Sequence, residues 1–283
     1  MNILFVCCYI NNSHLMQYSR KFLEKNLVNC NYKYICLNDA PDIENNEENY
    51  FNVCDMITGE LDCYKKIKEE AAKQNFIHIK IPQNIHSKNN EVGGWRHANI
   101  LTWFCKNVDN IFTNYKNYDY LCYIDSDVFL RKKFDVVNEL KDYDIIAPII
   151  QSDPRLPHHI HPHAGLTFIN LKTILNIKEM DWGIATNRIN CDTGSKMSEW
   201  LLKNKNYKIK QIGFYKGFWN NTKSENLKIL EGVHEIDSWC DDKFYHFRGG
   251  SCGSIGMLHE RIKRPDGVKK YIKRFNNFLK YFE

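Results

Sequence analysis

The sequence has no apolar run that approaches the ~18–20 residues a helix needs to cross a bilayer. Its first residues, MNILFVCCYI, lack the basic start and the longer apolar core of a secretory signal peptide, and they predict a strand instead. No internal repeat and no low-complexity linker divides the chain. We therefore expect a cytoplasmic protein, in which any contact with a membrane surface is peripheral.

Cysteine pairs of the Cys-x-x-Cys type are also absent, although the chain has 11 cysteines. Such pairs are typical of structural zinc sites and of redox motifs. The odd number of thiols and their scattered positions argue against a disulfide framework as well. We expect free thiols in a reducing compartment.

A strong charge imbalance is missing too. The formal net charge is +5 and the isoelectric point is near 8.5, which is too weakly basic to indicate nucleic-acid binding. With 283 residues, 43% of them apolar and 26% charged, the chain has the composition of an ordinary globular protein with a sizeable core. Nucleic acid is therefore not an expected partner.

Strand-like and helix-like segments alternate along the first half of the chain. Short apolar or alternating runs, typical of strands, fall at residues 3–8, 32–37, 76–81 and 121–124. Spacing typical of amphipathic helices is found at residues 13–27, 61–73 and 93–112. This order predicts an α/β fold with a mostly parallel central sheet and helices on both faces. Ligands of such sheets bind beyond the carboxyl ends of the strands.

The second half of the chain continues the same sheet. Strands are predicted at residues 143–150, 165–171 and 207–212, and a helix at residues 193–204. The boundary between the halves is soft and lies near residue 130. We expect a single compact domain built from residues 1–130 and 131–260, followed by a C-terminal helix over residues 261–283.

Two carboxylates follow the strand predicted at residues 121–124, in the sequence YLCYIDSDVFL. Asp125 and Asp127 are two residues apart, so in extended chain their side chains point the same way. They repel each other unless a cation lies between them or one takes up a proton. Carboxylate oxygens suit Mg²⁺ or Mn²⁺, which also bind phosphates. The alternative is a solvated turn, because Asp and Ser are common turn residues.

The segment YDYLCYIDSDVFL, followed by FDVVNELKDYDIIAP and HAGLTFINLK, resembles the core of nucleotide-sugar glycosyltransferases of the GT-A fold. In that family a strand ends in Asp-x-Asp, and a later strand containing Ala-Gly lines the acceptor side. The resemblance covers residues 1–253. It implies a GT-A-like Rossmann-type sandwich, with the nucleotide sugar bound by the first half and the acceptor by the second. It also implies metal-dependent transfer of a sugar, with a UDP-sugar as the favoured donor, to a hydroxyl of a glycan or lipid-linked acceptor.

A set of metal ligands follows from the same resemblance. Asp127 would bind Mn²⁺ or Mg²⁺ directly, and Asp125 would reach the metal, directly or through water, and the ribose. His246, in FYHFRGGS, would be the third ligand, because a neutral imidazole coordinates Mn²⁺ well. Gly249 and Gly250 would let backbone N–H groups approach the phosphates. A packed surface histidine before a loop is the alternative for His246.

Further residues are expected at the nucleotide sugar. Arg96 carries a planar guanidinium that could pair with the diphosphate or orient Asp125, or it could be a solvated residue of an amphipathic helix. Asp39 could accept hydrogen bonds from the ribose or from the uracil N–H, or it could be a turn residue. Besides the two glycines, the expected nucleotide-sugar ligands are Cys8, Tyr9, Asp39, Arg96, Asn99, Asp125 and Ser126.

Asp192 and His163 are the residues expected to act on the acceptor. Asp192 stands at the start of a predicted helix, where an aspartate commonly caps the helix and stabilises it by about 0.5–2 kcal/mol. In inverting GT-A enzymes an acidic residue at a comparable place deprotonates the acceptor hydroxyl, so Asp192 could serve both purposes. His163 precedes Ala164-Gly165 and would line the acceptor cleft. Trp219 is a candidate platform for a sugar ring, or else a packed core residue.

The C-terminal tail is basic and amphipathic. Residues 261–283 contain 8 Lys or Arg, and their apolar residues recur at helical spacing. The predicted helix either docks on the domain with a solvated basic face or contacts a membrane surface peripherally.

Two other functions fit the same fold class. A sugar-phosphate nucleotidyltransferase shares the sheet but usually carries a Gly-rich, basic loop directly after the first strand, and CCYINNSHLMQYSR contains no such loop. A non-catalytic carbohydrate-binding protein would not need Asp125, Asp127 and His246 together. Retention or inversion of the sugar's configuration stays open.

Overall fold

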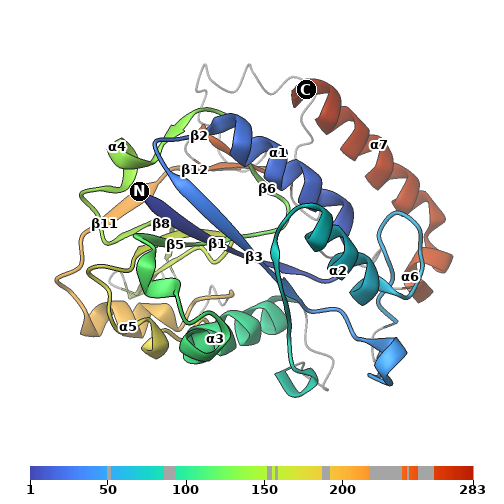
Figure 1. The fold of residues 1–283 in the computed structure, drawn as a ribbon, viewed down its shortest axis with the longest axis horizontal. Coiled ribbons are helices and arrows are strands. Elements are labelled where there is room, and N and C mark those ends of the chain that lie inside the picture. Colours follow the sequence, from blue (N-terminus) through green and yellow to red (C-terminus); the bar gives the residue numbers. More distant parts are fainter. Residues whose placement is uncertain are drawn as a thin grey trace.

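A computed structural model describes residues 1–49, 52–85, 93–151, 155–156, 159–186, 192–216, 238–240, 242–247 and 258–282. These residues form an α/β structure in which helices cover both faces of a central sheet (Figure 1). The sheet is mixed but largely parallel, as the alternating pattern predicts. It contains strands from both halves of the chain.

The central sheet is built around its first strand. In spatial order the strands are β11 (Ile209–Ile212), β8 (Ile145–Gln151), β10 (Leu166–Asn170), β5 (Tyr120–Ile124), β1 (Asn2–Tyr9), β3 (Asn31–Asn38) and β4 (Ile77–Lys80), and β9 (Ile160–Pro162) pairs with β8. β1 runs parallel to both of its neighbours. Along this path of described strands β10 alone is reversed, since it pairs antiparallel with β5 and with β8.

The two central strands are continuous apolar runs because both of their faces are covered. Alternate side chains of β1 enter different cores: Ile3 and Phe5 on one face, Leu4 and Val6 on the other. All five residues of β5 are buried. The charged side chains of Asp39 and Asp125 follow directly after the carboxyl ends of β3 and β5, and these ends meet that of β1 at one edge of the sheet.

Helices cover the two faces of the sheet (Figure 1). α1 (Met16–Asn26) and α2 (Cys63–Lys73) pack on the face that carries Phe5, whereas α3 (Gly93–Ile111) and α5 (Met197–Lys203) pack on the face that carries Leu4. The remaining helices are α4 (Val136–Leu140), α6 (Leu258–Lys263) and α7 (Pro265–Phe282). Single 3₁₀ turns lie at Ser13–Leu15, Ile43–Asn45, Gln83–Ile85, Tyr115–Asn117 and Ile177–Glu179.

A second, antiparallel sheet adjoins the end of β5. Its strands are, in spatial order, β12 (Phe214–Lys216), β13 (Ser238–Cys240), β14 (Phe244–His246) and β6 (Val128–Leu130). Because β5 ends at Ile124 and β6 begins at Val128, residues 125–127 form the turn that joins the two sheets. β2 (Leu27–Val28) and β7 (Phe134–Asp135) make a further short parallel pair.

The C-terminal segment contains two helices where one was predicted. Pro265 is the first residue of α7; it cannot donate an N–H to continue α6, but its backbone angle suits the first position of a new helix. Tyr271, Phe275 and Phe278 are buried in an apolar cluster shared with α1, β6 and β14. The apolar face of α7 is therefore docked on the domain.

Two further expectations from the sequence concern its thiols and its lack of long apolar runs. The 8 cysteines whose side chains are described are all free. Most are buried, and burial raises the pKa of the Cys105 thiol to about 11. No helix in the described parts of the chain is long and apolar enough to cross a membrane.

Candidate functional site

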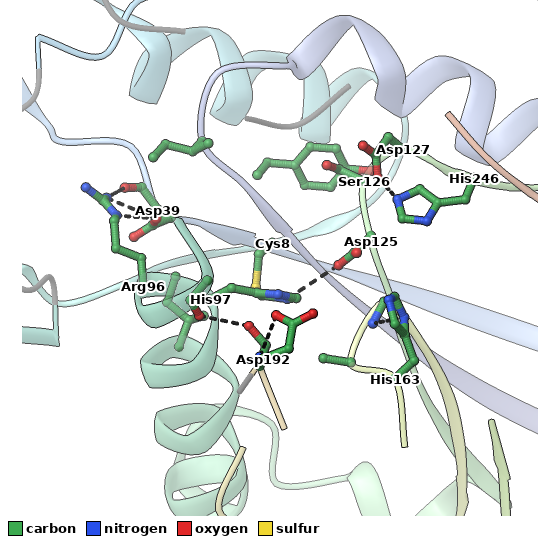
Figure 2. Close-up of a pocket in the computed structure, with 17 residues that line it drawn as sticks. Cys8, Asp39, Arg96, His97, Asp125, Ser126, Asp127, His163, Asp192 and His246 are labelled. Atoms are coloured by element: carbon green, nitrogen blue, oxygen red, sulfur yellow. Dashed lines mark hydrogen bonds and ion pairs between the residues drawn. The ribbon is translucent and has the colours of Figure 1, made fainter. Parts of the chain in front are cut away.

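A cavity of about 340 Å³ lies at the carboxyl ends of the parallel strands β1, β3 and β5 (Figure 2). Its walls also include the first turns of α3, the approach to β10 and the end of β14. The predicted site residues that line it are Cys8, Tyr9, Asp39, Arg96, Asp125, Ser126, Asp127, His163, Asp192 and His246. Residues predicted from seven separate segments of the sequence thus meet in one place. Gly249, Gly250 and Trp219 lie outside the described residues.

The turn over residues 125–127 is held by hydrogen bonds to neighbouring segments. The backbone N–H of Asp125 donates to the carbonyl oxygen of Gly165 at 2.9 Å. Ser126 is buried, and its Oγ accepts a hydrogen bond from Asn12 Nδ2 at 2.7 Å. Both aspartates of the turn line the cavity, so the turn is not simply a solvated one.

His246 reaches this turn through strand pairing. β14 lies antiparallel to β6 with His246 opposite Val128, and the N–H of Phe247 donates to the carbonyl oxygen of Asp127 at 2.8 Å. His246 Nε2 is then 3.3 Å from Asp127 Oδ1. Ligand atoms of Asp125, Asp127 and His246 all lie within 4.8 Å of one another. Among the described residues this is the one group of three or more His, Cys, Asp or Glu side chains that could share a metal ion.

The donor set of this cluster fits a hard divalent cation. Two carboxylates and an imidazole offer oxygen and nitrogen ligands to Mn²⁺ or Mg²⁺, and three protein ligands leave positions for phosphate oxygens. Gly165 supports this fit, because a Cβ at this position would overlap Asp125 Oδ2 and come within 2.6 Å of His163 Cε1. The absence of a side chain there lets the Asp125 carboxylate take its place in the cavity.

His97 is a cavity residue that the sequence did not reveal. Its Nε2 is 3.5 Å from Asp125 Oδ1 (Figure 2). Burial raises the pKa of the Asp125 carboxyl above its ordinary value of 3.8; His97 counteracts this shift and the nearby Asp127 adds to it. Gly94, His97 and Ile100 all line the cavity at a spacing of three residues, and this helical period is the signal that could have identified His97.

Arg96 is engaged with Asp39. Its Nε donates to Asp39 Oδ2 at 3.1 Å, and its Nη2 donates to the Asp39 carbonyl oxygen at 3.0 Å. Both side chains are buried. His97, the next residue of α3, lies beside Asp125, because successive helical residues point about 100° apart.

Asn99 was expected at the nucleotide sugar, but it does not line the cavity formed by the described residues. The cavity side of α3 is the one that carries His97 and Ile100. Asn99 lies two residues after His97, which corresponds to about 200° of helical rotation, so it does not share the side of α3 that carries His97.

Asp192 lines the cavity without capping a helix. α5 begins at Met197, with Lys196 at its N-cap, so the predicted helix starts later than expected. Asp192 Oδ1 accepts a hydrogen bond from the N–H of Thr193 at 2.7 Å, and Thr193 Oγ1 donates to the carbonyl oxygen of Gly94 at 2.8 Å. The exposed Asp192 carboxylate therefore belongs to a turn that is tied to the start of α3.

His163 has a defined ring orientation in the cavity. Its Nδ1 accepts a hydrogen bond from the N–H of Gly165 at 3.0 Å. In the neutral imidazole the proton is then on Nε2, which can donate to a ligand. The ring centroid lies 6.1 Å from that of His246, so His163 lies next to the candidate metal ligands.

No protein-family model matches the chain, and a search of curated proteins finds none that matches it. Function is therefore inferred from the residues of the cavity themselves.

Proposed function

We propose that the protein is a metal-dependent glycosyltransferase of the GT-A fold. It would move a sugar from a nucleoside diphosphate sugar, with a UDP-sugar as the favoured donor, to a hydroxyl of a glycan or lipid-linked acceptor. The observation that carries the proposal is the cluster of Asp125, Asp127 and His246 in a cavity at the carboxyl ends of parallel strands. Nucleotides bind α/β sheets at this edge, and Mg²⁺ or Mn²⁺ bound by carboxylates commonly binds phosphates as well.

Asp125, Asp127 and His246 would hold the metal ion. When bound, a divalent cation neutralises the negative charge of a departing nucleoside diphosphate. The protein's contribution is to hold the three ligands in place beforehand. Gly165 and Asn12 bond to the turn that carries the aspartates, and pairing between β6 and β14 places the histidine.

The start of α3 and the Arg96–Asp39 pair would bind the nucleotide. Backbone N–H groups and the helix dipole make the N-terminal end of a helix favourable for phosphate. The Asp39 carboxylate, held by Arg96, can accept hydrogen bonds from ribose hydroxyls or from a base N–H. Cys8 and Tyr9 form the wall at the end of β1. Burial raises the pKa of the Cys8 thiol well above its ordinary value of 9.0, so Cys8 stays protonated and contributes shape rather than a nucleophile.

Asp192 and His163 would act on the acceptor. The Asp192 carboxylate is exposed on the cavity wall, where it can accept the proton of an incoming hydroxyl. The His163 Nε2–H can donate a hydrogen bond to an acceptor oxygen or to the sugar. His163 reaches the cavity from directly after β9, and Asp192 reaches it from the segment before α5.

We further propose that the protein works in the cytoplasm and that any membrane contact is electrostatic. The apolar face of α7 is buried in the domain, so it is not available for insertion into lipid. The exposed lysines of α7 could still contact anionic headgroups through charge alone; they are Lys269, Lys270, Lys273 and Lys280. Eight free thiols are in keeping with a reducing compartment.

A thermal-shift panel of nucleotide sugars, each with and without Mn²⁺, tests this function. The true donor, at about 100 times its dissociation constant, should stabilise the fold by about 2.7 kcal/mol, and only with Mn²⁺ present. Asp127→Asn should abolish the stabilisation, whereas Asp142→Asn, which changes an exposed carboxylate, should retain it. The proposal would be wrong if no nucleotide sugar stabilised the protein in the presence of Mn²⁺.

A further inference from the structure

We propose that α7 positions the metal ligand His246 by clamping the residues on either side of it. The inference rests on the proposed function, because it concerns a ligand of the same metal site. It assigns α7 a role in metal affinity that is separate from any contact made by its basic outer face.

Side-chain alternation along β14 divides its residues between two environments. Phe244 points into the main core, where its ring lies 5.3 Å from Phe134, and His246 points into the cavity. Tyr245 and Phe247 point the other way, into the apolar cluster beneath α7. The face of this segment opposite His246 is thus covered by the C-terminal helix.

The two neighbours of His246 are both packed against aromatic rings of α7. Tyr245 stacks on Phe278, with ring centroids 5.3 Å apart and an interplanar angle of 15°. Phe247 is fully buried, and its ring centroid lies 5.4 Å from Phe278 and 5.8 Å from Tyr271. A third residue of α7, Arg274, places its guanidinium carbon 3.9 Å from the centroid of the Phe247 ring.

Phe278 also reaches the strand that follows Asp127. Its ring centroid lies 5.2 Å from that of Phe129 in β6, which pairs with Tyr245 in the ladder. One side chain of α7 therefore contacts both strands that lead to metal ligands. The distance between Asp127 and His246 depends on how these two strands lie against each other.

β14 needs this support because it is short. It is three residues long, and its ladder partners β6 and β13 are equally short. Such strands gain little stability from backbone pairing alone, and most of their order comes from side-chain packing. Loss of the packing under α7 would let His246 shift, and groups that orient a metal ligand typically contribute about 10- to 100-fold to metal affinity.

Mn²⁺ binding measured by electron paramagnetic resonance, with Mn²⁺ as the only ligand, tests the clamp in the full-length protein. Phe278→Ala should weaken Mn²⁺ binding about tenfold. Asn277→Ala, at the adjacent and exposed position of α7, should leave the affinity unchanged. Phe278→Leu keeps a large apolar side chain and should restore most of the affinity; it also serves if the alanine variant does not fold.

A double-mutant cycle separates positioning from general loosening of the fold. In a His246→Ala background the ligand is already gone, so Phe278→Ala should change Mn²⁺ affinity by less than about twofold. The positioning role of α7 would be wrong if Phe278→Ala bound Mn²⁺ as wild type does, or if this substitution weakened binding equally in both backgrounds.

If wild type bound no Mn²⁺, the metal site and the positioning role of α7 would both be wrong. If Mn²⁺ bound as expected but no nucleotide sugar did, the proposed transferase alone would fail.

Discussion

Gly165 determines how closely Asp125 can approach the rest of the cavity. Its carbonyl accepts the N–H of Asp125, its own N–H donates to His163 Nδ1, and a Cβ would occupy the space of the Asp125 carboxylate. One residue without a side chain thereby places both the aspartate and the histidine.

We expect Gly165→Ala to weaken Mn²⁺ binding about tenfold or more, because Asp125, one of the three proposed metal ligands, must move. Isothermal titration with Mn²⁺ measures this. Gly183→Ala is the matched control: its Cβ would lie 2.7 Å from Asp181 Oδ1 and 2.8 Å from Lys196 Cδ, but both are flexible, partly exposed side chains that can move away. Equal affinities for the two variants would contradict this role of Gly165.

Single residues differed in how far the sequence could identify them. Asp125 and Asp127 were predictable because a local pattern, charge at the end of an apolar strand, marks them. His97 was not, because the neighbouring Arg96 is the more obvious partner for an anion and only the helical phase separates the two. The pairing of Arg96 with Asp39 joins two segments 57 residues apart, and no local pattern specifies such a contact.

α7 is tied to the 3₁₀ turn that precedes α1, at Ser13–Leu15, through His14. The Nε2 of His14 lies 2.9 Å from the Tyr271 hydroxyl, and its ring packs edge-on against Phe275 at 5.3 Å. Burial lowers the pKa of His14 from 6.5 to about 4, although the nearby Asp55 opposes this shift. The docked helix therefore favours the neutral imidazole.

Because the pKa of His14 is lower in the folded protein than in the unfolded chain, the unfolded chain takes up a proton at His14 at a higher pH than the folded protein does. The free energy of unfolding should therefore be unaffected by His14 above pH 6.5 and should decrease as the pH falls toward 4, by up to roughly 3 kcal/mol. Urea denaturation between pH 7 and pH 4 measures this loss, with His14→Gln as the reference that cannot titrate. Parallel pH profiles for the two proteins would show that His14 does not contribute.

Elements buried on both faces were predicted closely, and elements that depend on distant partners were not. The predicted strand at residues 3–8 became Asn2–Tyr9, since its apolar run is long and continuous. The antiparallel sheet of β6, β12, β13 and β14 was missed because its strands are only three residues long. In addition, β6 pairs with a strand more than 100 residues away, since Val128 lies opposite His246. The break at Pro265 was overlooked although proline marks it locally.

At the scale of the whole molecule, the topology explains why the site exists. Parallel pairing of β1 with β3 and β5 brings the ends of three strands to one edge, and β14 adds His246 from the far end of the chain. The α/β architecture and this edge could be derived from the order of elements. The join between two sheets at residues 125–127 required the structure, because it depends on β6 leaving the central sheet.

The most direct test of the central claim is Mn²⁺-dependent release of UDP from UDP-sugars. Wild-type protein should release UDP with Mn²⁺ and lose this activity in excess EDTA. Asp127→Ala should reduce the rate by about 100-fold or more, because a principal ligand of the charge-neutralising ion is removed. Full activity of Asp127→Ala, or full wild-type activity in excess EDTA, would contradict a metal-dependent transferase built on Asp125, Asp127 and His246.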